Sequence, residues 1–149
     1  MNVSQASKIW LEYHRAHSKY NTVRAYQFII EKFNQNFANL NLIKVSQDDI
    51  LDFMAKFTEG RKPQTKRVRF SQLTAFFNFM RTNFDCDFKN PCDSPMLRKL
   101  FRPKTNVHWD IIEKETVDEI IFRTNNVRNR LMLELMARGG MRVGEVLKL

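Results

Sequence analysis

A glycine pair followed by an arginine near the C-terminus is the feature of this sequence best suited to chemistry. Gly139 and Gly140 follow an apolar stretch, and paired glycines there predict a tight turn, with a new helix from about Arg142. The start of a helix favours anions through its free N–H groups, and a guanidinium adds a planar fork that fits two phosphate oxygens. Glu145 is placed to hold Arg142 or a neighbouring group. One interpretation of the motif is therefore a phosphate-binding arginine.

The same residues also fit a purely structural interpretation. Arg142 and Glu145 can form a local ion pair on an ordinary turn between two helices, and short motifs have low specificity. From the residues alone, both interpretations stay open.

The second feature is the distribution of charge. The chain has 149 residues and a net charge of +9. Between Arg61 and Lys104, eleven Lys and Arg residues stand against three Asp, a net charge of +8, whereas residues 1–60 carry +1 and residues 105–149 are neutral. A localised basic surface is typical of proteins that bind a phosphate backbone. A solvated face that keeps the protein soluble is the alternative.

Other kinds of site find little support in the sequence. The three histidines and two cysteines (His14, His17, His108, Cys86 and Cys92) do not have the spacing of a zinc site, so we predict no metal. The sequence has no signal peptide and no apolar run of membrane length. We therefore expect a soluble, cytoplasmic protein without a membrane partner.

Helices are the elements that must position these residues. Four glycines and four prolines are too few for the turns of a β-sandwich or barrel, so we predict an all-α fold. The second helix would be capped by Asn21 or Thr22, would carry its apolar stripe from Tyr26 to Phe37, and would fray in the segment 34–41. Apolar residues three and four apart, with capping residues and prolines, predict helices at about Val3–His17, from Asn21 or Thr22, after Ser46, from Pro63, from Ser94-Pro95 to Phe101, at Lys114–Arg123 and at Val127–Arg138.

The helix from Pro63 is the most informative, because it combines an apolar stripe with basic residues. Lys66, Arg67 and Arg69 lie in its N-terminal half. The stripe predicted to be buried consists of Phe70, Leu73, Phe77, Met80 and Phe84.

The elements group into two domains. We predict a bundle of four or five helices over residues 1–101, a polar linker over 102–110, and an incomplete second domain over 111–149. The run 131–136 is apolar on almost every side, which predicts a helix buried within a larger domain.

The glycine-arginine motif resembles the tyrosine recombinase (phage integrase) signature around the first catalytic arginine. The similar residues are Gly140-Met141-Arg142-Val143-Gly144-Glu145, followed by Leu147 and Leu149. Gly139 departs from that signature, which more often has threonine there. The segments 21–26, 45–50 and 70–79, followed by Asn90-Pro91, resemble in order three helices of the family's core-binding (SAM-like) domain and its exit.

The resemblance implies a four- or five-helix core-binding bundle followed by the first helices of an incomplete catalytic domain. Arg142 would contact the scissile phosphate and stabilise its developing charge, with Glu145 in support and no metal or nucleotide cofactor. The family's tyrosine nucleophile lies further downstream, whereas Tyr13, Tyr20 and Tyr26 all fall in the first two predicted helices. As an N-terminal fragment, the chain is therefore expected to bind DNA but not to cut it.

The resemblance further implies that the second and fourth helices and the linker grip double-stranded DNA, mostly at phosphates. The predicted contacts are Thr22, Arg24, Lys62, Thr65, Lys66, Arg67, Arg69, Arg102 and Lys104.

Two other functions remain open from the sequence. The first is a non-catalytic DNA-binding or regulatory module of the same fold. The second is a helical protein-interaction domain without a nucleic-acid role. An incomplete second domain would also leave the run 131–136 without packing partners, so we expect self-association through it.

Overall fold

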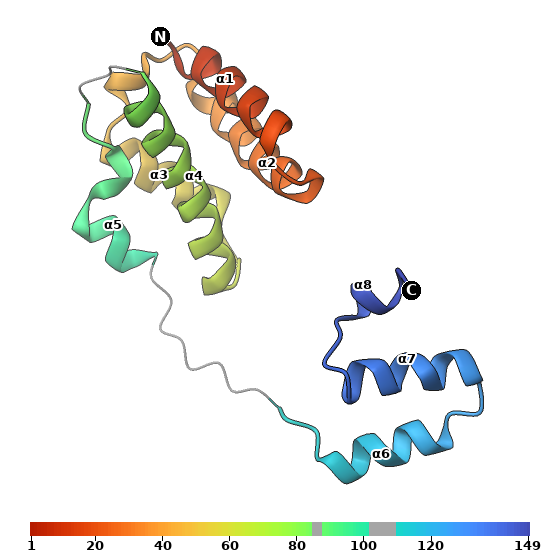
Figure 1. Cartoon of the computed structure of the whole chain (residues 1–149). Coiled ribbons are helices and arrows are strands. Elements are labelled where there is room, and N and C mark those ends of the chain that lie inside the picture. The colour runs from red at the N-terminus through yellow and green to blue at the C-terminus, as the bar shows by residue number, and fades with distance from the viewer. Residues whose placement is uncertain (85–87, 102–109) are drawn as a thin grey trace. The chain divides into compact units, whose positions relative to one another are not determined.

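The computed structural model describes residues 1–84, 88–101 and 110–149, and its regular structure is helical throughout these ranges (Figure 1). The predicted all-α class is therefore confirmed. The chain divides into two compact units, Met1–Thr105 and Asn106–Leu149. Most of the predicted linker, residues 102–109, lies outside the described residues.

The first unit is a helical bundle in which α4 packs against both α1 and α2 (Figure 1). Two short 3₁₀ turns, η1 and η2, connect its helices. The elements are α1 (Val3–His17), α2 (Tyr20–Phe37), η1 (Leu42–Lys44), α3 (Gln47–Phe57), α4 (Pro63–Asn83), η2 (Pro91–Asp93) and α5 (Pro95–Leu100).

Local capping chemistry sets the start of three helices. The Ser46 hydroxyl accepts from the Asp49 backbone N–H at 3.1 Å, and the Asp49 carboxylate accepts from the Ser46 N–H at 2.9 Å, as predicted for α3. Asn2 and Gln5 form a similar reciprocal pair at α1. Pro63 occupies the first turn of α4, where its missing N–H costs nothing.

The predicted start of α2 is wrong. The helix begins at Tyr20, and its N-cap, Lys19, makes no capping hydrogen bond through its side chain. At the other end α2 continues to Phe37, the last residue of the predicted apolar stripe, and its last turn falls in the segment expected to fray. Two tertiary contacts hold this last turn: Asn34 accepts a hydrogen bond from the Ser7 hydroxyl at 3.2 Å, and the ring of Phe37 lies 6.4 Å from that of Phe53 on α3.

The core of the first unit forms around α4. Phe70, Leu73, Phe77 and Met80 are buried as predicted, while Phe84 is half-buried. Phe76 lies outside the predicted stripe but is also fully buried, because α1 covers that side of α4 and brings Trp10 to 5.4 Å from its ring. Each such aromatic side chain contributes about 1.5–3 kcal/mol through burial.

A buried asparagine attaches the chain after α4 to the bundle. Asn90 is 3% exposed and donates to the Asn78 side chain at 2.8 Å, while its own oxygen accepts from the Cys92 N–H at 2.8 Å. Close by, Asp93 pairs with both Arg81 (3.2 Å) and Arg98 (2.6 Å). Part of the basic middle segment therefore serves structure and is neutralised locally.

The thiol of Cys92 should be inert while the protein is folded. Burial raises its pKa to about 12, so in a Cys86→Ser background a thiol reagent at pH 8 should label the folded protein at least about a hundredfold more slowly than the urea-unfolded chain. At a pH between the pKa of this thiol in the unfolded chain and its higher pKa in the folded protein, the thiol is ionised mainly in the unfolded state. The free energy of unfolding should therefore fall by about 1.4 kcal/mol per pH unit until the folded pKa is reached. Rapid labelling of folded protein would contradict this prediction.

The second unit contains α6 (Lys114–Arg123), α7 (Val127–Ala137) and a short α8 (Val143–Val146). The apolar run 131–136 falls in α7 as expected, and none of the residues of this helix is buried within the second unit. Leu131 is 58% exposed, and Phe122 on α6 is 76% exposed. The apolar side chains of α7 have too few neighbours in three short helices to be covered.

Candidate nucleic-acid interface

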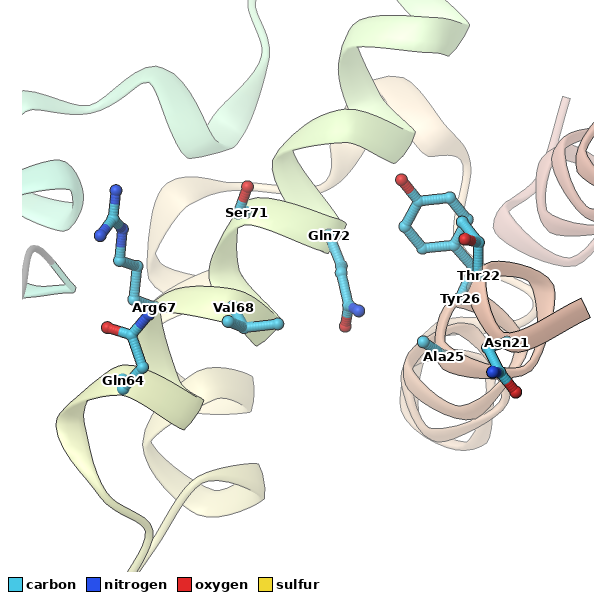
Figure 2. A pocket seen from close by; sticks show the side chains of 9 residues that line it. All are labelled: Asn21, Thr22, Ala25, Tyr26, Gln64, Arg67, Val68, Ser71 and Gln72. Atoms are coloured by element: carbon cyan, nitrogen blue, oxygen red, sulfur yellow. The ribbon is translucent and has the colours of Figure 1, made fainter. Parts of the chain in front are cut away.

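An open groove of about 590 Å³ runs between the first turns of α2 and α4 (Figure 2). Both helices begin at this end of the bundle, so their N-terminal turns form the two walls. The lining consists of Asn21, Thr22, Ala25 and Tyr26 from α2 and Gln64, Arg67, Val68, Ser71 and Gln72 from α4.

The helical repeat of α4 decides which of its polar side chains reach the groove. Gln64, Arg67 and Ser71 are three and four residues apart, and they lie on the side of α4 opposite the buried Leu73 and Phe77. The aromatic residues of α4 therefore face the core, and the groove receives mainly polar side chains.

Of the predicted DNA contacts, Thr22 and Arg67 line this groove, one on each wall. Arg24 is exposed on an adjoining surface of α2, and Lys62 and Thr65 are exposed at the start of α4. No ion pair joins Arg24, Lys62 or Arg67 to an acidic side chain within the part of the chain that the structure describes. These three side chains are free to bind an external anion. The other two predicted contacts, Arg102 and Lys104, lie outside the described residues.

Lys66 does not share this groove. It is half-buried and lines a separate cavity of about 490 Å³, formed with residues of α3 and α5 that include Leu51 and Leu100. Neighbouring basic residues on one helix are thus directed to different surfaces, because successive positions are about 100° apart around the axis.

Arg69 is also turned away from the open surface, toward α2. Its guanidinium lies 4.7 Å from the centre of the Phe28 ring. Nη1 donates to Gln72 Oε1 at 3.1 Å and to the Ala25 carbonyl at 3.5 Å. Burial, with a smaller effect from Arg61, lowers the pKa of the Arg69 guanidinium. Arg69 therefore connects α4 to α2 across the groove.

Sequence reasoning missed the uncharged polar residues of the groove. Asn21, Gln64, Ser71 and Gln72 were not among the predicted contacts, which were chosen mainly by charge. The spacing of Gln64, Arg67 and Ser71 opposite the apolar stripe was a usable signal for α4. The position of Asn21 depends on tertiary packing.

Next to the groove lies a histidine, His14, whose surroundings lower its pKa. The ring of His14 is 4.6 Å from that of Tyr26, which lines the groove, and its Nδ1 is hydrogen-bonded to the Ser18 hydroxyl at 2.8 Å. Burial, and then the nearby His17, lower the pKa of His14. Both effects favour the neutral form of the His14 imidazole.

Arg142 is the N-cap of α8 in the second unit, where a helix was predicted to begin. The Glu145 carboxylate accepts from the Arg142 backbone N–H at 2.8 Å and lies 3.4 Å from Nη1, and the arginine side chain is 87% exposed. Gly140 has φ +64°, and a Cβ on Gly139 would come within 2.6 Å of the Leu135 carbonyl oxygen. Both glycines are therefore required by the turn before Arg142.

The described residues offer neither a metal site nor a membrane-spanning helix. No three His, Cys, Asp or Glu side chains among them lie together as metal ligands would. None of their helices has the length and apolar character needed to cross a membrane.

Comparison with known families gives one match. Residues 2–58 match the model of the phage integrase N-terminal SAM-like domain, a segment that spans α1 to α3. No curated protein and no solved structure matches the chain.

Proposed function

We propose that the protein binds double-stranded DNA. The proposal starts from the amino-terminal part of this chain, which is an N-terminal SAM-like domain of the phage integrase (tyrosine recombinase) family. A domain of this family suggests a role in site-specific recombination. The DNA-binding surface in our proposal is the α2/α4 face, which we define as the groove between these helices together with Arg24, Lys62 and Thr65.

The observation that carries this proposal is the contrast between paired and unpaired cations. Arg81 and Arg98 are bound to Asp93, whereas Arg24, Lys62 and Arg67 on the α2/α4 face are exposed and have no acidic partner among the described residues. Unpaired cations around a polar groove suit a duplex, whose phosphates flank base edges with hydrogen-bonding groups.

Counterion release gives the proposal a quantitative test. Each phosphate that a protein neutralises on duplex DNA adds about −0.9 to the slope of log K against log salt concentration. Three to six contacts therefore predict a slope of about −3 to −5 for this protein. We would titrate a fluorescent random-sequence duplex and follow its anisotropy at several salt concentrations. Absence of binding at low salt, or binding that does not change with salt, would refute the proposal.

A separate part of the proposal concerns Arg142. We propose that it binds a DNA phosphate, with Glu145 holding it at the start of α8. The support is the exposed guanidinium and its contact with Glu145. For an Arg142→Ala variant, the slope of log K against log salt concentration should then be smaller in magnitude by about one. The slope of an Arg128→Ala variant, which removes an exposed cation from the same part of the chain, should not change in this way. Equal slopes in the two variants would count against a phosphate site at Arg142.

We also propose that the second unit self-associates through its exposed apolar side chains. Ile120 and Phe122 on α6 and Val127 and Leu131 on α7 are each at least 48% exposed, which favours burial between copies. The apparent mass from light scattering should rise with protein concentration, and a Phe122→Ser/Leu131→Ser variant should remain monomeric. A constant monomer mass for the wild type would contradict this prediction.

A further inference from the structure

The lining of the groove between α2 and α4 carries almost no charge. Arg67 is its single charged residue, and Figure 2 shows that the Arg67 side chain extends away from α2, whereas Val68 and Gln72 extend toward it. Phosphates are bound mainly by cations, whereas base edges are read by amides, hydroxyls and apolar contacts. The interior of the groove therefore suits base edges, and the cations around it suit phosphates.

Gln72 lines this groove, and a neighbouring charge sets the orientation of its side-chain amide. Its Oε1 accepts a hydrogen bond from Arg69 Nη1 at 3.1 Å. A guanidinium has only donors, so the oxygen and not the nitrogen of the amide must face it. The Gln72 NH₂ group is left available, since no acceptor for it is found among the residues that the structure describes.

Arg69 is itself fixed by α2. Its guanidinium stacks over the Phe28 ring at 4.7 Å and donates to the Ala25 carbonyl at 3.5 Å. These contacts leave Arg69 half-buried, in contrast to the exposed Arg67 two residues earlier. Arg69 is therefore better placed to orient Gln72 than to bind a phosphate.

We propose that Gln72 reads one base pair of the bound duplex as a hydrogen-bond donor, and that Arg69 is the positioning residue that fixes its amide. This inference rests on the proposed function. In the major groove a donor fits N7 or O6 of guanine, N7 of adenine or O4 of thymine, and it opposes the N4 amino group of cytosine. The expected signature is one position of the binding site, on the contacted strand, from which cytosine is excluded.

The test is a selection of bound duplexes from a randomised library, with the wild type and a Gln72→Glu variant. Glutamate keeps an oxygen for Arg69 but replaces the free NH₂ donor with an acceptor. The excluded base should then become the preferred one at that position, because a carboxylate accepts from cytosine N4. We expect a change of about tenfold in relative affinity, the usual order for one base pair.

Gln64→Glu is the matched control. It adds the same charge to the same groove, but Gln64 has no arginine partner among the described residues. This variant should lower affinity for all sequences and leave the cytosine-excluding position unchanged. Arg69→Met provides a second test, since it retains an apolar stem over Phe28 but releases the Gln72 amide. Exclusion of cytosine should be relaxed in this variant, and a Lys66→Met variant with the same loss of charge should retain it.

The outcomes separate this inference from the proposed function. If the wild type binds duplexes without excluding cytosine at any position, or if Gln72→Glu and Arg69→Met keep the wild-type preference, the role of Gln72 is overturned while DNA binding stands. If the wild type binds no duplex, the proposed function fails, and this inference fails with it. Circular dichroism of each variant checks that the helical fold is intact.

Discussion

An Arg24→Ala/Lys62→Ala/Arg67→Ala variant should bind a random-sequence duplex roughly 10- to 100-fold more weakly than the wild type at moderate salt. Its salt slope should be smaller by about three units, one for each phosphate that the variant no longer neutralises. The three side chains are exposed and form no ion pair among the described residues, so their removal leaves no buried charge without a partner. Protein stability should therefore change little, and the loss should be confined to binding.

The control for this variant removes the same charge elsewhere on the first unit. Lys8, Lys32 and Lys44 are exposed residues of α1, α2 and η1 that do not line the groove between α2 and α4. Their combined replacement by alanine should slightly weaken the long-range attraction between the protein and DNA. Most of the dependence of log K on log salt concentration should remain. If both triple variants lost affinity equally, general positive charge rather than the α2/α4 face would account for binding.

Phe77→Ala should have the largest effect on stability, a loss of about 3–5 kcal/mol in the free energy of unfolding. Phe77 is completely buried on α4, and its ring lies 5.9 Å from Phe33, 5.1 Å from Phe76 and 6.3 Å from Phe88. Alanine would leave a cavity at the point where α4 meets α2 and the segment after α4. Because small domains are only marginally stable, most of the first unit should unfold near room temperature.

Urea denaturation followed by circular dichroism and by Trp10 fluorescence, in a Trp109→Phe background, measures this loss. Tyr20→Ala is the matched control: it also removes an aromatic ring, but from a side chain that is 77% exposed. That variant should differ from the wild type by less than about 0.5 kcal/mol. A Phe77→Ala protein as stable as Tyr20→Ala would show that α4 is not the centre of the core.

Local signals in the sequence were enough to predict most helices. The Ser46–Asp49 capping pair and Pro63 each act within one turn of the helix they start, so neighbouring residues reveal them. The start of α2 has no such signal, because Lys19 makes no side-chain capping bond. The apolar spacing did carry this helix to Phe37, but the order of its last turn depends on contacts with α1 and α3, which sequence periodicity does not contain.

The candidate site was predictable in outline but not in detail. Charge drew attention to the start of α4, and Arg67 from that region lines the groove. The direction taken by Arg69 could not be predicted, because it depends on Ala25 and Phe28, more than 40 residues earlier in the chain. The hydrogen bond between Arg69 and Gln72 follows from that packing, and it is the reason that we propose an orienting role for Arg69.

The most direct measurement of the central proposal is an NMR titration of the ¹⁵N-labelled protein with a short duplex at low salt. We predict that backbone amide shifts concentrate in the first turns of α2 and α4, around Thr22 and Arg67, and that the side-chain amide of Gln72 shifts with them. Shifts confined to the other end of the bundle, or to α6 and α7, would contradict DNA binding by the α2/α4 face.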